Sequence, residues 1–240
     1  MFERVKLLLS DEGYDVLSKS TVLVIGVGGV GSIAVEALAR SGIGKVIIVD
    51  HDTIALSNLN RQVQTKHSNV GQSKCVAMVE HIKAIHPDLN IEAHDQFFDE
   101  ACEYLLDDVD FVIDAIDTIS SKFLIMQMCA KKKMPLVTCL GMGNRVDPTK
   151  ISVTTLDKTT YDPVAKLLRK KARRAHLNTR KFKVVYSSEQ PIKQKVILNE
   201  KGSTRKQQMP PASMFIVPPT AGLTCAYYCI DTLLKNNAIL

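Results

Sequence analysis

The sequence predicts an α/β protein with a Rossmann-like, doubly wound and mostly parallel sheet, and a C-terminal α+β extension packed on it. Strand-like and helix-like stretches alternate through the first two-thirds of the 240 residues, as in proteins built from strand–helix–strand crossovers. The strand-like stretches at 111–113 and 136–138 are nearly all apolar, which is expected when helices cover both faces of a sheet. A glycine-rich turn between the first strand and the first crossover helix completes the pattern.

Strands are expected at 21–26, 45–50, 90–97, 110–116 and 135–140, and helices at 32–41, 71–85, 99–107 and 120–133. Ligands of a doubly wound sheet bind beyond the carboxyl ends of its strands. Asp50, Asp117 and the 140–145 loop all fall at such ends. We therefore expect a binding site at this edge of the sheet.

The two ends of the chain depart from this alternation. A short amphipathic helix is expected at 4–17, before the first strand. After residue 148 we expect strands at 151–156 and 182–186, a basic helix at 163–174, a mobile loop at 190–211, and a closing helix at about 220–234 after the break at Pro218-Pro219. We divide the chain into residues 1–150 and an extension, 151–240, that together form one continuous structural unit.

The composition is that of an ordinary globular protein, with 45% hydrophobic and 23% charged residues. No apolar run approaches the ~20 residues that a membrane-spanning helix needs. The first residues lack the features of a signal peptide, so we expect a cytoplasmic protein. None of the six cysteines forms a C-x-x-C pair, and we expect neither structural zinc nor a disulfide framework.

The net charge of +6 is unevenly distributed. Between Lys158 and Pro210 the chain carries 15 Lys and Arg residues against 3 Asp and Glu residues. Such asymmetry indicates a polyanionic partner, of which RNA is the obvious candidate. The alternative is a solubilising or disordered loop.

The glycine run at 26–31 is typical of a dinucleotide-binding turn. Gly26 permits the tight turn, Gly28 and Gly29 let backbone amides approach a phosphate, and Gly31 lets the following helix lie close to the strand. The N-terminus of that helix adds a partial positive charge. Asp50 follows ~20 residues later, where a carboxylate accepts ribose hydroxyls. These features fit NAD and ATP equally well.

The next segment favours ATP. Asn58, Arg61, Gln62 and Lys74 follow the ribose carboxylate, before the third strand. Attack on an α-phosphate needs such cations because the leaving pyrophosphate carries charge, whereas hydride transfer has no use for them. An NAD-dependent oxidoreductase, with Arg61 and Lys74 as solvated surface charges, is the alternative.

The stretch 26–145 resembles the ThiF, MoeB and ubiquitin-activating superfamily, which adenylates carboxylates with ATP. The matching residues are GVGGVGS at 26–32, Asp50, SNLNRQ at 57–62, VGQSK at 70–74 and DAID at 114–117. Nearly the whole chain is similar to the tRNA threonylcarbamoyladenosine dehydratase family. The further marks are FER at 2–4, LLS at 8–10, VIDAID at 112–117, PLVT at 135–138, DPT at 147–149, DP at 162–163, SSE at 187–189 and VPPTAG at 217–222.

The resemblance implies a ligase-type enzyme that activates the carboxylate of N6-threonylcarbamoyladenosine, next to the anticodon of a tRNA, as an acyl-adenylate. Ring closure would expel AMP, with a net loss of water. Residues 1–150 would form the ATP-binding adenylation domain. The extension, 151–240, would supply a basic RNA-facing insert that holds tRNA phosphates, and the closing helix.

The resemblance also implies roles for individual residues. The nucleotide would be bound by Gly26, Gly28, Gly29, Gly31, Asp50, Asn58, Arg61, Gln62 and Lys74. Asp117 would face Mg²⁺ and the phosphates, although it could also cap the helix at 120–133. Arg4 matches an N-terminal arginine that homodimers of the superfamily place in the neighbour's site. We therefore expect a homodimer, and catalytic roles for Arg61, Lys74, Asp117 and Arg4.

The chain departs from its relatives in its cysteines. Well-known members of the family carry a cysteine three residues before the SSE-like motif, where this chain has Val184, so a covalent thiol step at this position is excluded. Relatives that act on sulfur carriers hold zinc through two C-x-x-C pairs that are absent here. Cys139 lies at the carboxyl end of a strand, near the expected site, and a buried structural role is favoured over a reactive one.

Three matters stay open at this stage. The runner-up function is ThiF- or MoeB-like adenylation of the C-terminus of a ubiquitin-like sulfur-carrier protein. A catalytically idle RNA-binding protein, or a partner of a cysteine desulfurase system, is a further alternative. The sequence also leaves open a monovalent cation near the 139–145 loop.

Overall fold

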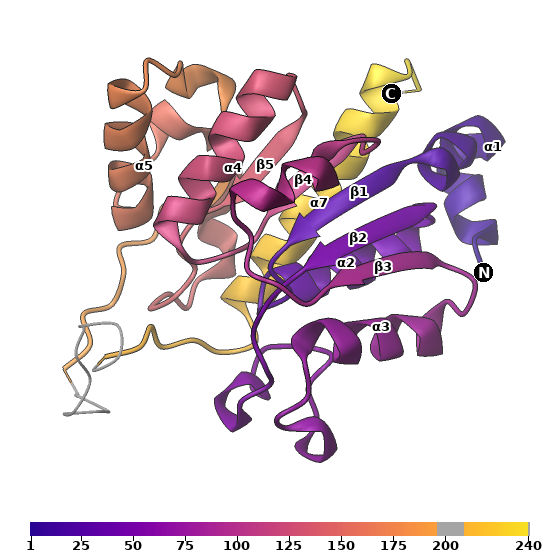
Figure 1. The fold of residues 1–240 in the computed structure, drawn as a ribbon, viewed down its shortest axis with the longest axis horizontal. Helices are drawn as coiled ribbons and strands as arrows, with labels where there is room; N and C mark the ends of the chain where they lie inside the picture. Colours follow the sequence, from indigo (N-terminus) through magenta and orange to yellow (C-terminus); the bar gives the residue numbers. More distant parts are fainter. Residues whose placement is uncertain (196–208, 240) are drawn as a thin grey trace.

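The computed structural model describes residues 1–195 and 209–239, which form a seven-stranded sheet with helices on both faces (Figure 1). The strands are β1 (Thr21–Ile25), β2 (Lys45–Val49), β3 (Asn90–His94), β4 (Phe111–Asp114), β5 (Leu136–Cys139), β6 (Ile151–Thr155) and β7 (Lys183–Ser187). The helices are α1 (Glu3–Lys19), α2 (Gly31–Ser41), α3 (Lys74–Ile85), α4 (Ile119–Lys132), α5 (Pro163–Arg174), α7 (Val217–Asn236) and the 3₁₀-helix η3 (Glu100–Leu106).

The strand order is β3-β2-β1-β4-β5-β7-β6. All neighbouring strands run parallel except the edge strand β6, which is antiparallel to β7. The chain leaves β1 towards β2 and β3 and later returns to its other side through β4. This reversal opens a crevice at the carboxyl end of β1, and the predicted fold class is confirmed.

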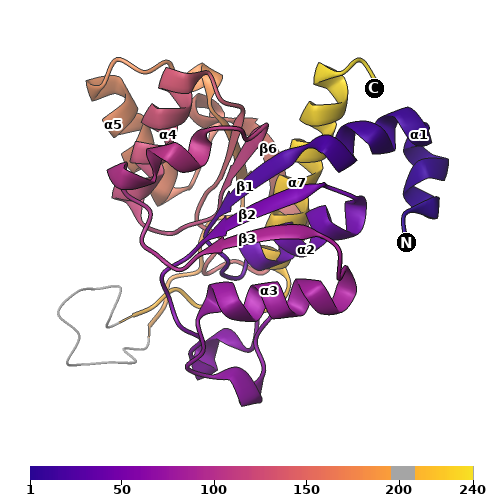
Figure 2. The ribbon, with the colours of Figure 1, turned by 45° about the vertical axis from the view of Figure 1, so that its right-hand side comes forward.

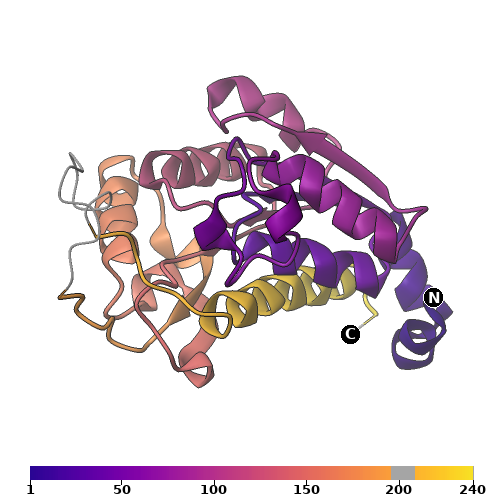
Figure 3. The ribbon, with the colours of Figure 1, turned by 90° about the horizontal axis from the view of Figure 1, so that it is seen from below.

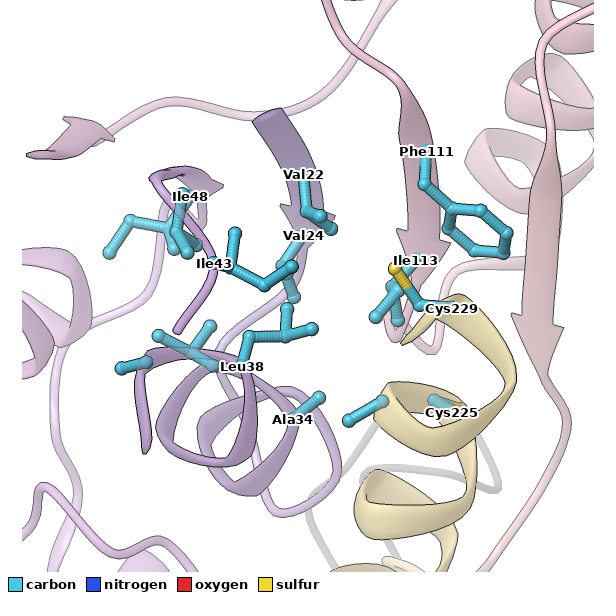
Figure 4. Packing of buried hydrophobic residues seen from close by; sticks show 14 of the residues in the cluster. Val22, Val24, Ala34, Leu38, Ile43, Ile48, Phe111, Ile113, Cys225 and Cys229 are labelled. Atoms are coloured by element: carbon cyan, nitrogen blue, oxygen red, sulfur yellow. The ribbon is translucent and has the colours of Figure 1, made fainter. Parts of the chain in front are cut away.

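Alternate side chains of each strand enter two apolar layers. Val22 and Val24 of β1 pack with α2, α3 and α7, whereas Leu23 and Ile25 pack with η3 and α4. Figures 2 and 3 show α2 and α7 side by side on one face of the sheet, with α4 and α5 on the other. In Figure 4 the side chains of β1 and β4 meet those of α2 and α7. The sheet is therefore covered on both faces, as its apolar strands predicted.

Three helices begin or bend at places that the predictions missed. Helix α3 starts at Lys74 rather than at 71, because the Ser73 side chain accepts from its first turn. Helix α7 starts at Val217, so Pro218 and Pro219 lie in its first turn, where the missing N–H groups have no helical partner. The expected break before this helix is thus wrong. Helix α1 is bent at Ser10, whose φ is 65°.

Two strands end two or more residues earlier than predicted, and both early ends lie beside the crevice. Strand β3 stops at His94 rather than at 97, and β4 stops at Asp114 rather than at 116. The residues beyond these ends leave the sheet and line a cavity described below. The expected helix at 99–107 is the short 3₁₀-helix η3, with Asp99 accepting from the Ala101 amide at 2.9 Å.

The C-terminal extension shares the sheet of the first part, since β6 and β7 join it beside β5. The division at residue 150 stays a prediction. Much of the expected mobile loop, residues 196–208, lies outside the described residues. Among the helices that the structure describes, we find none with the length and apolar character needed to cross a membrane.

Candidate active site

A cavity of about 540 Å³ opens where β1, β2, β4 and β5 end. One side of it is supplied by residues 96–98, after β3, and by lining residues between 26 and 74 that follow β1 and β2 or stand at their ends; we call this side the first wall. The opposite side is formed by residues 115–122, which follow β4, and 139–143, at the end of β5; we call it the second wall. The site thus lies at the predicted edge of the sheet.

The glycine turn of the first wall has the geometry that its sequence predicts. Gly26 has φ +91°, a conformation that favours glycine, and its amide donates to the Val49 carbonyl at 2.7 Å. A Cβ on Gly31 would lie 1.7 Å from the Gly26 carbonyl oxygen, so α2 begins in direct contact with the turn. Gly26, Gly28 and Gly29 line the cavity, whereas Gly31 is not among its lining residues.

Asp50 is fixed by backbone amides. Its carboxylate accepts from Val27 N at 2.8 Å and from Asp52 N at 2.9 Å. One oxygen therefore binds the glycine turn and the other binds the chain beyond β2. Each oxygen retains a lone pair, so the carboxylate can also accept hydroxyl groups of a ligand in the cavity.

Arg61 rises from the turn after the 3₁₀-helix Leu56–Asn58 and lies against Gly29. Its Nη1 donates to the Ser57 carbonyl at 2.8 Å and to Asn60 Oδ1 at 3.0 Å. Burial lowers the pKa of the guanidinium, but its ordinary value is so high that the group stays cationic at neutral pH. A partly desolvated cation thus faces the cavity beside the glycine turn.

Gln62 and Asn58 complete this part of the first wall. Both are buried and line the cavity. The Asn58 Oδ1 accepts from Ala55 N at 3.0 Å. The Gln62 Oε1 is buried without a hydrogen-bond partner among the described residues, so it is available to a donor in the cavity.

Lys74, the first residue of α3, is paired with Asp52. Its Nζ lies 2.6 Å from Asp52 Oδ2, and both residues line the cavity. The next residue, Cys75, is buried beneath Asp50, and burial together with that carboxylate raises the pKa of its thiol to about 12. Sequence analysis predicted the lysine but missed Asp52, because no motif separates it from other surface carboxylates.

Asp117 lies on the second wall and is exposed to solvent. Beneath it, Asp114 at the end of β4 pairs with Lys122 of α4 at 2.9 Å, and both are buried. Burial raises the pKa of the Asp114 carboxyl, and the nearby Lys122 opposes that rise. Lys122 also reaches the cavity, and sequence analysis missed it.

The loop after β5 closes the second wall with Leu140, Gly141, Met142 and Gly143. Asn144 fixes the far end of this loop. Its amide donates to the Ala212 carbonyl at 2.7 Å, and its Oδ1 accepts from Ala212 N at 2.8 Å. The chain around Ala212 thereby lies against the cavity, which Pro210, Pro211 and Ser213 also line.

Comparison with known proteins identifies the family. The sequence profile of the ThiF family matches residues 3–234. The chain belongs to the ThiF family. One ThiF-family relative, the tRNA threonylcarbamoyladenosine dehydratase of Bacillus subtilis (strain 168), is 40% identical over 99% of this chain and 96% of that protein. The tRNA threonylcarbamoyladenosine dehydratase of Haemophilus influenzae is 34% identical over 92% of this chain and 88% of that protein.

Solved structures agree with the ThiF assignment. The crystal structure of Escherichia coli tRNA N6-threonylcarbamoyladenosine dehydratase in complex with ATP matches with a TM-score of 0.87 and 30% identity, and it covers 99% of this chain and 95% of that chain. Escherichia coli MccB with ATP matches with a TM-score of 0.64 and 19% identity over 93% of this chain and 58% of that chain, and shares the fold. The predicted family is therefore confirmed.

Within the ThiF fold, most of the predicted site residues lie at one cavity. These are Gly26, Gly28, Gly29, Asp50, Asn58, Arg61, Gln62, Lys74 and Asp117. Arg4 does not line the cavity. Helix α1, which carries Arg4, lies near the amino ends of the strands, whereas the cavity lies at their carboxyl ends (Figure 1). His51 and Phe97, whose rings meet edge to face at 5.1 Å, line the cavity and were missed.

The two positions that bear on thiol chemistry are both buried. Val184 is fully buried in β7, in an apolar cluster with α4 and α5. Cys139 reaches the cavity, and its thiol donates to the Leu140 carbonyl at 3.6 Å. A hydrogen bond with Cys139 and burial raise the pKa of Cys225 in α7, so the two thiols lie against each other.

Proposed function

We propose that this protein uses ATP to cyclise N6-threonylcarbamoyladenosine in tRNA through a carboxyl-adenylate intermediate. The observation that carries the proposal is the position of Arg61 and Lys74, two buried or half-buried cations, at the same cavity as the glycine turn and Asp50. The dehydratase names of the full-length relatives support the substrate.

In this proposal ATP lies across the carboxyl end of β1. The turn at 26–31 and the N-terminus of α2 bind phosphate oxygens, and Asp50 accepts the ribose hydroxyls. A carboxylate oxygen of the substrate attacks the α-phosphorus, and the bond from that phosphorus to the bridging oxygen of pyrophosphate breaks. Arg61 and Lys74 stabilise the charge that develops on the phosphate oxygens.

The second step is ring closure. A nucleophile within the threonylcarbamoyl group attacks the activated carbonyl and loses a proton, and AMP leaves with the electron pair of the broken C–O bond. ATP is thus converted to AMP and pyrophosphate while the tRNA loses the elements of water. No covalent enzyme intermediate is needed, which agrees with Val184 at the position of the family cysteine.

Asp117 is the residue to which we assign magnesium. Mg²⁺ at nucleotide sites is held by one or two carboxylates together with phosphate oxygens, and the Asp117 carboxylate at the cavity fits this donor set. Asp50, His51 and Asp52 also bring ligand atoms within 4.8 Å of one another. The Asp50 carboxylate already accepts two amides and Asp52 is paired with Lys74, so this cluster is the weaker candidate.

The tRNA would be held by the exposed basic face of α5. Lys166, Lys170, Arg173 and Arg174 are exposed on this helix, and Leu168 and Ala172 are buried on its other side. In Figure 1 α5 stands at the edge of the molecule beside α4. Lys201, Arg205 and Lys206, which also belong to the predicted basic insert, lie outside the described residues.

We further propose a homodimer in which Arg4 enters the partner's cavity, since it is remote from the cavity of its own chain. Mixing an Arg4→Ala variant with an Arg61→Ala variant tests this directly. Random dimers would have ~25% of their sites intact, and activity should recover to that level. Absence of recovery, with exchange of subunits demonstrated, would refute the trans role. A cysteine desulfurase partner stays a prediction.

The decisive experiment supplies ATP, Mg²⁺ and threonylcarbamoyl-modified tRNA. We expect AMP, pyrophosphate and tRNA nucleosides lighter by one water, measured by mass spectrometry, with Asp117→Asn as the impaired variant. Unmodified tRNA is the control, because it lacks the carboxylate and should release no AMP. Unchanged tRNA, with adenylation of a sulfur-carrier protein instead, would replace the proposal with the runner-up function.

A further inference from the structure

We propose that the buried guanidinium of Arg145 takes the place of a monovalent cation beneath the 139–145 loop and so holds the second wall of the cavity. Arg145 lies two residues after Gly143, the last loop residue that lines the cavity, but is itself nearly inaccessible, with a side chain 2% exposed. It is therefore a positioning residue, because it acts on the cavity through the loop.

The guanidinium gathers three acceptors from three segments of the chain. Its Nη1 donates to the Gly141 carbonyl in the loop. Its Nη2 donates to Asp162 Oδ2 at 3.3 Å, and its Nε donates to the Glu189 carbonyl at 3.2 Å. The planar fork of arginine suits this divergent set of acceptors better than a single ammonium would.

The partner carboxylate is built into the start of α5. Asp162 is the N-cap of this helix, and its Oδ1 accepts from Ala165 N at 2.8 Å. Its side chain is fully buried, so the charge of Arg145 is balanced within the protein. Glu189, whose carbonyl binds Arg145, also accepts the amides of Val146 and Asp147 at 3.0–3.2 Å. The loop is thus attached on both sides of Arg145.

These contacts determine where the second wall lies. A Cβ added to Gly141 would stand 3.7 Å from Asp162 Oδ2 and 3.9 Å from Arg145 Nη1. The Gly141 backbone therefore rests on the ion pair, with its other side towards the cavity. Displacement of the guanidinium would release the Gly141 carbonyl and leave a buried carboxylate uncompensated.

The residues present do not fit a monovalent cation at this place. Na⁺ and K⁺ require several oxygen ligands, such as backbone carbonyls and carboxylates. The Gly141 and Glu189 carbonyls and the Asp162 carboxylate are such oxygens, and all three already accept from Arg145. A second cation among them would also be repelled by the guanidinium.

The first test uses the full chain without substitutions. ATP affinity and the unfolding temperature are measured in KCl, NaCl and choline chloride at one ionic strength. We expect the three Kd values to agree within about twofold. A wild-type protein that binds ATP well only in KCl or NaCl would overturn the proposal.

The second test replaces the guanidinium. Arg145→Ala should weaken ATP binding at least ~10-fold in choline chloride and lower the unfolding temperature. KCl, or ~20 mM guanidinium chloride, should restore most of the ATP affinity and of the unfolding temperature. The added cation can now bind the Gly141, Asp162 and Glu189 oxygens that Arg145 no longer contacts. Equal loss in every salt would show that Arg145 only stabilises the fold, against the proposal. If Arg145→Ala does not fold, the neutral variant Arg145→Gln, which fills more of the space but carries no charge, serves in the same assay.

Arg169→Ala is the matched control. Its Nη1 also donates to backbone carbonyls, of Leu156 at 3.2 Å and Thr159 at 3.1 Å, but it lies away from the cavity. We expect lower stability, unchanged ATP affinity and no response to added cations. The inference rests on the proposed function only in treating the cavity as an ATP site. Because no tRNA is used, failure of the dehydratase proposal would leave these measurements interpretable.

Discussion

The two walls of the cavity use their charged side chains in opposite ways. On the first wall, Lys74 lies 2.6 Å from the carboxylate of Asp52, which is 52% exposed. On the second wall, Lys122 and Asp114 lie 2.9 Å apart and are 2% and 0% exposed. Lys74 can leave its solvated partner, Asp52, and bind a ligand instead. Lys122 has a partner, Asp114, that water does not reach.

The difference in solvent exposure distinguishes a charged side chain that can bind a ligand from one that stabilises the structure around the cavity. A pair with one solvated member contributes little to stability, because water replaces the lost contact. Removal of one partner of a fully buried pair strongly lowers the stability of the protein, because an uncompensated charge remains buried. We therefore expect substitution of Lys74 on the first wall to lower activity, and substitution of Lys122 on the second wall to lower stability.

The largest effect is expected for Lys122→Met. Removal of the ammonium leaves Asp114 buried and unpaired, which should lower the free energy of unfolding by about 3–5 kcal/mol. Chemical denaturation measures the change. Lys131→Met, on the same helix but in an exposed pair with Glu103, is the control and should unfold like the wild type. Recovery of most of the stability in the Lys122→Met/Asp114→Leu double variant would confirm the cause.

Arg61→Ala should have the next largest effect, this time on turnover. In the proposed mechanism Arg61 is a preorganised cation at the α-phosphate, and its loss is expected to slow AMP formation at least ~10²-fold, with little change in the free energy of unfolding. Arg40→Ala, which removes an exposed arginine paired with Glu36, is the control. If turnover of Arg61→Ala equals that of the control, Arg61 does not act in the reaction.

Lys74→Met should weaken ATP binding by ~10-fold through loss of one charged hydrogen bond to phosphate. Stability should fall less than in Lys122→Met, since water reaches Asp52. Calorimetric titration with ATP and chemical denaturation, applied to both Lys74→Met and Lys122→Met, give the loss of binding free energy and the loss of stability for each wall. Equal losses of stability would contradict the distinction drawn between them.

The smallest effect concerns the thiols. All six cysteines are buried, and the pKa of about 12 at Cys75 and at Cys129, raised by burial, leaves a thiolate fraction of ~10⁻⁴ at pH 8. Native protein treated with iodoacetamide at pH 8 should stay unmodified by mass spectrometry, whereas denatured protein should gain six labels. Rapid labelling of Cys139 in the native protein would reopen a thiol role on the second wall.

The glycine turn, Asp50 and the 58–74 segment of the first wall could be predicted from the sequence because they are close together along the chain, whereas Asp52, His51 and Phe97 were missed. A turn after β1, a carboxylate after β2 and the run from Asn58 to Lys74 occupy one connected stretch, and a parallel sheet brings their ends to one edge. Strand ends were less accurate, because Ala115 and Ile116 look like a continuation of β4 but leave the sheet at the cavity.

Asp117 and the 140–145 loop of the second wall were predicted, but its buried ion pairs could not be predicted in the same way. Arg145 and Asp162 meet only because the loop after β5 and the start of α5 are brought together by β6 and β7. Lys122 looks like an exposed helical lysine until β4 places Asp114 beside it. One local signal was available and unused: Ser73 before an apolar periodic stretch marks the start of α3 better than Gly71 does.

The hydrogen bonds of Asp50 have a kinetic consequence. Its carboxylate is aimed by the amides of Val27 and Asp52. The entropic cost of ordering this acceptor is therefore incurred when the protein folds and does not reduce the free energy of nucleotide binding. Association should then be limited by diffusion and orientation, so the observed rate should rise linearly with nucleotide concentration and show no slow isomerisation.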